Sequence, residues 1–145
     1  MLDPAAKADF ERQYRLVLVM YTAMLASIFV YLGIGFVLVR ILTSRPQVSS
    51  ELFVLVFYGL AATLIGVILR VRKSWLAPLF SSTAGDLSSS LSRYRTGYIL
   101  VFVLCETITI FGLVLLFLMG SLIHLVYFAL LSLAMMTISY PKRVE

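Results

Sequence analysis

Four apolar stretches, each about as long as a membrane is thick, determine what this chain can fold into. They cover residues 16–39, 52–69, 97–119 and 122–140. A hydrocarbon core of about 30 Å needs roughly 20 helical residues at 1.5 Å each, and every backbone polar group inside it must be bonded internally. The stretches are apolar on all faces, which excludes the alternating pattern of a β-barrel. We therefore predict an all-α, integral membrane four-helix bundle forming a single domain.

The composition favours the same class. Of the 145 residues, 61% are hydrophobic and 13% are charged, whereas a soluble domain has about 45–50% apolar and about 25% charged residues. A chain of this size cannot bury so much apolar surface, so lipid must cover part of it. The formal net charge is +5, but the basic residues flank apolar stretches and no nucleic-acid-binding motif is present. We therefore expect a lipid bilayer as the surroundings and no nucleic acid as a partner.

The distribution of Lys and Arg predicts the orientation of the bundle, because cytoplasmic loops carry an excess of these residues. The N-terminal segment, the second loop and the C-terminal segment together hold ten of them: Lys7, Arg12, Arg15, Arg70, Arg72, Lys73, Arg93, Arg95, Lys142 and Arg143. The first loop holds Arg40 and Arg45, and the third loop holds none. We therefore predict that both termini are cytoplasmic. The short loops and the strong charge bias favour a multi-pass protein of a bacterial inner (plasma) membrane.

The segments outside the four stretches also carry structural signals. Residues 4–15 predict a helix that lies along the lipid headgroups and joins the first span, since Pro4 suits a first helical position. The second loop, at about 70–95, is the only long one, and Trp75 beside basic residues predicts an interfacial stretch there. The third loop, at residues 120–121, is very short. The third and fourth spans are therefore expected to be adjacent and antiparallel.

Glu106 is the only charged residue well inside any of the apolar stretches. A charge at the bilayer centre costs roughly 2.5–3.5 kcal/mol on insertion scales, and such groups are functional by default. Because desolvation disfavours the charged form, we expect a protonated carboxyl at neutral pH, able to release a proton or hold a cation. Thr107 and Thr109 are its nearest polar neighbours, and Thr109 shares its helix face. These three residues form the predicted proton or ion site, with Ser132 or Thr137 at similar depth on the fourth span. A purely structural hydrogen bond from Glu106 to another helix is the alternative.

Small residues recur along one side of the second span, at Gly59, Ala62, Thr63 and Gly66. This spacing predicts close helix packing, with packing inside the chain favoured over self-association. His124 lies about twelve helical residues, or roughly 18 Å, from the depth of Glu106. We therefore expect it to hydrogen-bond to water at the outer membrane surface.

The residue combinations of an enzyme are missing from the sequence. It contains no metal-ligand cluster, no nucleophile–base pair and no phosphate-binding loop. The single cysteine, Cys105, lies in an apolar stretch and is expected to be a buried apolar residue. We therefore predict no catalytic residue, no metal site and no cofactor.

The third span reads Cys105-Glu106-Thr107-Ile108-Thr109-Ile110-Phe111-Gly112-Leu113-Val114. This segment resembles the carboxylate-bearing helix of the proteolipid c subunits of rotary ATP synthases, in which an aromatic-Gly-Leu element follows a mid-membrane carboxylate. The resemblance implies that Glu106 binds the coupling ion. It covers residues 105–114 only, since the second span lacks the regular glycines of that family's inner helix, and it does not imply a ring-forming subunit. Small multidrug resistance transporters are a second comparison, as four-helix proteins of similar size with one intramembrane Glu, placed in their first helix.

Three functions follow as alternatives. The first is a subunit or accessory protein of a larger membrane complex that handles protons or cations at Glu106. The second is a dimeric proton-coupled transporter, and the third is a purely structural or assembly protein. Because few polar intramembrane residues are available to line a water-filled cavity, the sequence favours the first. The expected partners are other membrane subunits or a second copy of the chain.

Overall fold

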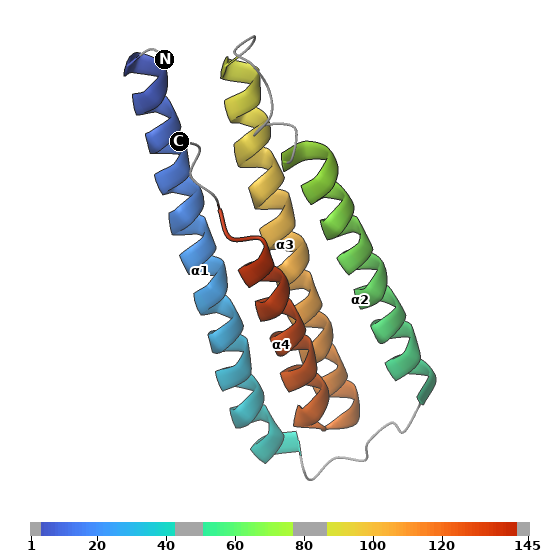
Figure 1. Ribbon diagram of the computed structural model, residues 1–145. Coiled ribbons are helices and arrows are strands. Elements are labelled where there is room, and N and C mark those ends of the chain that lie inside the picture. The colour runs from blue at the N-terminus through green and yellow to red at the C-terminus, as the bar shows by residue number, and fades with distance from the viewer. Residues whose placement is uncertain (1–3, 43–50, 77–86, 142–145) are drawn as a thin grey trace.

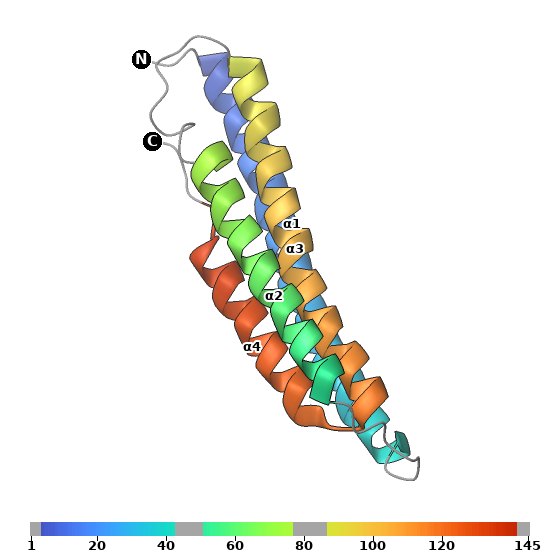
Figure 2. The ribbon, with the colours of Figure 1, turned by 90° about the vertical axis from the view of Figure 1, so that its right-hand side faces the viewer.

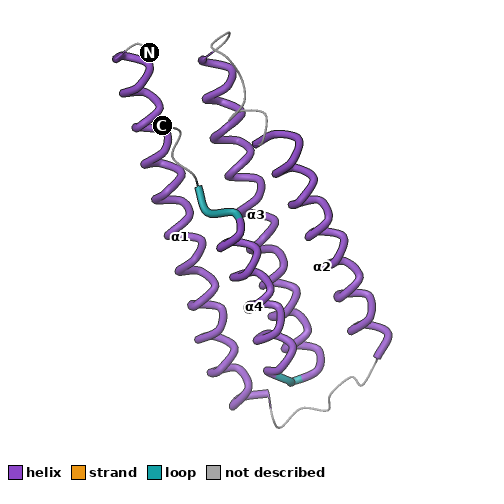
Figure 3. The backbone as a smooth tube through the Cα atoms, in the orientation of Figure 1, coloured by secondary structure: helices purple, strands orange, loops and turns teal. Residues whose placement is uncertain are grey.

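In the computed structural model, the residues that are described are 4–42, 51–76 and 87–141, and nearly all of them are helical (Figures 1 and 3). The helices are α1 (Pro4–Leu42), α2 (Glu51–Val71), α3 (Leu87–Met119) and α4 (Leu122–Ile138), with the single π-helical turn η1 (Arg72–Leu76) directly after α2. No strand occurs in these three ranges. The predicted all-α class is confirmed for this part of the chain.

Three of the helices are long and apolar enough to cross a membrane, over Ala8–Ile41, Glu51–Ser74 and Ser92–Met119. Length and composition therefore indicate a multi-pass membrane protein. The fourth helix, α4, is apolar but has 17 residues, which gives a length of about 25 Å. The predicted span continued to residue 140, but the helix ends at Ile138. There the backbone bonds tighten from the i−4 to the i−3 pattern, with Ser139 donating also to Met136 and Tyr140 donating to Thr137.

Helix α1 has no break near residue 15, where the predicted headgroup helix was to join the first span. Between residues 5 and 32 the sequence contains neither Gly nor Pro, so nothing interrupts the helical hydrogen bonds. The first turns of α1 also have a partner, because the ring of Phe10 packs on that of Tyr94, with 5.5 Å between centroids. Helix α3 begins at Leu87, well before the predicted span, and runs beside this part of α1. The 4–15 segment and the first span therefore form one continuous helix. The location of this segment along the headgroups stays a prediction.

Helix α3 is the central element of the bundle. It packs most extensively against α4, then against α1 and α2, and α4 also contacts α1. Helices α1 and α2 lie on either side of the α3–α4 pair (Figures 1 and 2). The connection between α3 and α4 is made by Gly120 and Ser121, and Gly120 has a φ of 64°, a left-handed conformation that glycine adopts without strain. The two helices are adjacent and antiparallel as predicted.

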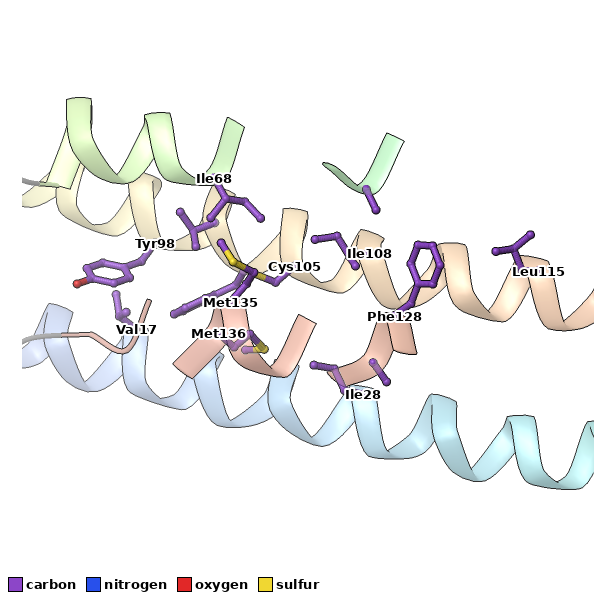
Figure 4. Close-up of a cluster of buried hydrophobic side chains, with 14 of the residues drawn as sticks. Val17, Ile28, Ile68, Tyr98, Cys105, Ile108, Leu115, Phe128, Met135 and Met136 are labelled. Atoms are coloured by element: carbon purple, nitrogen blue, oxygen red, sulfur yellow. The ribbon is translucent and has the colours of Figure 1, made fainter. Parts of the chain in front are cut away.

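A continuous apolar core lies along α3 and receives side chains from every helix (Figure 4). Its members include Val17, Ile28, Ala61, Ile68, Tyr98, Phe102, Cys105, Ile108, Leu115, Phe128, Met135 and Met136. Cys105 is fully buried, as expected for a small apolar residue. The outer surface of the bundle is apolar as well, with exposed Leu, Val, Ile and Phe side chains on all four helices. Such a surface needs lipid or partner proteins to cover it.

The small residues of α2 do not pack against another helix inside the described chain, which corrects the favoured prediction. Gly59, Ala62, Thr63 and Gly66 are all exposed, and a Cβ on either glycine would meet no atom within 4 Å. The reason is that α2 contacts α3 through its opposite side, where Ala61 and Ile68 are buried. Packing of another protein molecule against the small-residue side of α2 stays a prediction.

Candidate functional site

Glu106 lies midway along the apolar segment Ser92–Met119 of α3. Its side chain is partly exposed, whereas the next-door residue Cys105 is fully buried. Helix α3 therefore directs Cys105 into the core and Glu106 towards the edge of its contact with α1. A partly exposed carboxyl at the depth of a membrane core is costly. Its free energy therefore depends strongly on whether it has a hydrogen-bond partner.

The partner of Glu106 is Tyr31 of α1. The Tyr31 hydroxyl donates a hydrogen bond to Oε1 of Glu106, with 2.9 Å between the two oxygens. Tyr31 itself lies well inside the apolar segment Ala8–Ile41, so the bond joins two polar groups that lipid cannot satisfy. Sequence reasoning missed Tyr31. The available signal was a tyrosine inside an apolar stretch, since a buried tyrosine hydroxyl usually finds a hydrogen-bond partner.

Thr107 and Thr109, predicted to complete the site, form no hydrogen bond with Glu106 in the structure. The Thr107 hydroxyl donates to the carbonyl of Val103 on its own helix at 2.9 Å. Thr109 is fully buried and its hydroxyl has no hydrogen-bond partner. Three residues separate it from Glu106, which contacts α1, and three more separate it from Gly112, which approaches α4 closely. Since a three-residue spacing leaves side chains about 60° apart around the helix, Thr109 lies between these two contacts.

Ser132 and Thr137 of α4 are likewise engaged elsewhere. The Ser132 hydroxyl donates to the backbone carbonyl of Cys105 at 2.6 Å, and the bond is buried between α3 and α4. The Thr137 hydroxyl donates to Leu133 of its own helix at 2.8 Å. Ser132 also explains the orphan hydroxyl of Thr109, because the Cys105 carbonyl is the group that a helical threonine at position 109 would ordinarily use.

A second polar contact joins α2 to α4, away from Glu106. The Tyr58 hydroxyl lies 3.5 Å from Nδ1 of His124, and the two rings meet edge to face with centroids 6.2 Å apart. The ring of Phe128 also packs on Tyr58, with 4.8 Å between centroids. His124 thus has a protein partner, which the sequence analysis did not anticipate. As predicted, it is not the partner of Glu106.

The chemistry available at Glu106 is that of a single carboxyl with one hydroxyl donor. Within the described ranges, no group of three or more His, Cys, Asp or Glu residues could hold a metal ion. With Tyr31 donating to Oε1, the other oxygen is left to take up or release a proton. The arrangement is therefore a single carboxyl held by one hydrogen bond at the edge of the α1–α3 contact.

Comparison with protein-family models, with curated proteins and with solved structures found no match to this chain.

Proposed function

We propose that this chain is a four-span membrane protein with cytoplasmic termini that serves as a subunit or accessory protein of a larger membrane complex and handles protons or cations at Glu106. The observation that carries the proposal is the hydrogen bond from Tyr31, well inside the apolar segment of α1, to Glu106, midway along that of α3. The bilayer strongly disfavours a carboxyl at this depth, and such groups mark ion and proton pathways. The partial exposure of Glu106 supports access from outside the chain.

The outer surface of the bundle supports the subunit part of the proposal. Helix α2 leaves its small-residue side open, with Gly59 and Gly66 facing no other atom of the described chain. Small residues of this kind let a neighbouring helix approach closely in a membrane. The partner is another membrane subunit or a second copy of this chain.

Four spans with cytoplasmic termini are supported by the charge distribution and by the α3–α4 hairpin. The beginning of α1 and the end of α4 lie towards the same end of the bundle (Figure 1). Helix α4 is slightly shorter than the hydrocarbon core, a mismatch that local thinning of the bilayer accommodates at small cost. We would introduce Asp9→Cys and Ser121→Cys, each in a Cys105→Ala background. The two variants should react with a membrane-impermeant maleimide that is added on opposite sides of the membrane. Reaction of both from one side would contradict the topology. The bacterial inner membrane stays a prediction from the sequence.

The purely structural function is the second candidate, and the same hydrogen bond favours it, because Tyr31 and Glu106 join α1 to α3. The two functions differ in whether Glu106 exchanges its proton in the folded protein. A structural carboxyl that is enclosed by its neighbours does not exchange its proton. A carboxyl that handles ions must exchange it.

A hydrophobic carbodiimide separates the two, since it modifies protonated carboxyls that are reachable from lipid. We would treat the membrane-embedded full chain across a pH series and measure intact mass and the modified residue. Labelling of Glu106 that persists at neutral pH supports ion handling, with Glu106→Gln as the unlabelled control. Glu51 at the exposed start of α2 provides an internal control for carboxyls in water. No labelling of Glu106 at any pH would replace the proposal with the structural function.

A further inference from the structure

We infer that the ion taken up by Glu106 is a proton and not a metal cation, and that Tyr31 is the residue that positions the carboxyl for it. The inference rests on the proposed function, which leaves the choice between proton and cation open. It follows from how few oxygen atoms the fold brings to Glu106.

Metal cations in proteins need more oxygen ligands than this site supplies. Calcium takes six to eight oxygens and magnesium requires near-octahedral coordination. Among the described side chains, Tyr31 is the one that hydrogen-bonds to Glu106. The site therefore offers the two carboxyl oxygens and one hydroxyl oxygen. Three oxygens from this chain leave most of the coordination sphere of such a cation unfilled, and a desolvated cation without ligands is costly.

The backbone adds no ligand at this depth. Sodium sites in membrane transporters use carbonyls freed where a helix is unwound. Here α1 and α3 are both continuous, from Pro4 to Leu42 and from Leu87 to Met119, so their carbonyls are bonded within the helices.

The nearby hydroxyls form their hydrogen bonds away from Glu106. Thr107 donates to Val103, and Ser27, one turn before Tyr31 on α1, donates to Met24 at 2.7 Å. Thr109 is fully buried, and its hydroxyl has no hydrogen-bond partner. In the described part of the chain none of these hydroxyls hydrogen-bonds to Glu106.

The charges around Glu106 are equally sparse. Tyr31 is the titratable group that faces it from α1. The titratable residues at the contact of α2 and α4, Tyr58 and His124, meet each other instead. Among the described residues, no Lys or Arg forms an ion pair with Glu106; Arg15, for example, pairs with Glu11.

A proton needs none of these additional ligands. The Tyr31 hydroxyl donates to Oε1 whether the carboxyl is neutral or ionised, and uptake adds H⁺ to Oε2, from which release returns it to water or to a partner group. Tyr31 therefore acts by orienting the carboxyl through its hydrogen bond to Oε1.

Carbodiimide labelling of the full chain in membranes tests the inference when the cation is varied at constant ionic strength. We expect superimposable labelling curves against pH in sodium, potassium and choline chloride. Protection of Glu106 by sodium or potassium but not by choline, at the same pH, would overturn the proton assignment while leaving ion handling intact. No labelling of Glu106 in any salt would remove both the inference and the proposed function. This comparison uses the wild-type chain and does not depend on the folding of a variant.

The role of Tyr31 is tested by Tyr31→Phe with Tyr58→Phe as the matched control. Loss of the donor should change the extent of Glu106 labelling at a given pH, because the carboxyl is no longer oriented by Tyr31. Tyr58→Phe should leave the curve in place. An unchanged curve for Tyr31→Phe, or equal shifts for both variants, would contradict a positioning role for Tyr31.

Discussion

Gly112 of α3 lies directly against Phe128 of α4. A Cβ built on Gly112 would lie 2.8 Å from the Cβ of Phe128 and 2.9 Å from the Cα of Leu125. The second of these atoms belongs to the backbone, so a side chain could be admitted only if the two helices moved apart. Gly112 thus permits a close approach of α3 to α4, one helical turn beyond the buried Thr109.

Substitution of Gly112 by Ala should therefore destabilise the bundle although alanine is the better helix former. Overpacking costs typically about 1–3 kcal/mol, against a gain of up to about 1 kcal/mol in helix propensity. We expect a net loss of about 1 kcal/mol in the free energy of unfolding, measured by denaturant titration in mild detergent. Gly59→Ala is the matched control and should cause no loss, because its Cβ would meet open space. Equal stabilities of the two variants would refute the close approach.

The buried hydroxyls of Ser132 and Thr109 should respond in opposite ways to removal. Ser132→Ala deletes the hydrogen bond to the Cys105 carbonyl and should lower stability by about 0.6 kcal/mol and at most about 1.7 kcal/mol. Thr109→Val removes a buried hydroxyl that has no partner, so stability should stay the same or rise. The same unfolding titration measures both. A larger loss for Thr109→Val than for Ser132→Ala would mean that Thr109 has a partner after all.

The Tyr31–Glu106 bond should appear as a coupling energy between its two side chains. A double-mutant cycle with Tyr31→Phe and Glu106→Met should give about 0.6 kcal/mol, with about 1.7 kcal/mol as the upper end for intramembrane hydrogen bonds. Glu106→Gln alone should cost little, because the amide oxygen still accepts from Tyr31. The control cycle pairs Tyr58→Phe with Glu106→Met and should give zero within error. Equal coupling in both cycles would argue against the direct bond.

Cys105 should be inert in the folded protein. Its side chain is fully buried, so a small maleimide in detergent should modify it only after denaturation. Thr96→Cys in a Cys105→Ala background is the control, since residue 96 is exposed on the same helix and should react without denaturant. Mass spectrometry follows both reactions. Similar rates for the two cysteines under native conditions would show that the core around α3 opens readily.

Several features of the fold were predictable because a helix is a local structure. The length and apolar character of each stretch predict helices of membrane length, since all helical hydrogen bonds form within the stretch. The two-residue connection after Met119 predicts the α3–α4 hairpin. Glu106 could also be identified as a site from its residue type and depth alone. The course of the polar N-terminal turns of α1 and α3 was less predictable. Helix α1 runs unbroken from Pro4, and its Phe10 ring packs on Tyr94 in the early turns of α3.

The partners of the polar residues were decided by the tertiary structure. In a soluble helix an apolar stripe indicates which side is buried, but these helices are apolar all round because lipid and core demand the same side chains. The sequence therefore determined that Glu106 lies at membrane depth, but not which neighbour it meets. That depends on the angle at which α1 and α4 approach α3, which is set by close contacts such as Gly112 with Phe128. At that angle Glu106 meets Tyr31 and Thr109 is buried without a hydrogen-bond partner, and the small-residue side of α2 is left without a partner among the described residues.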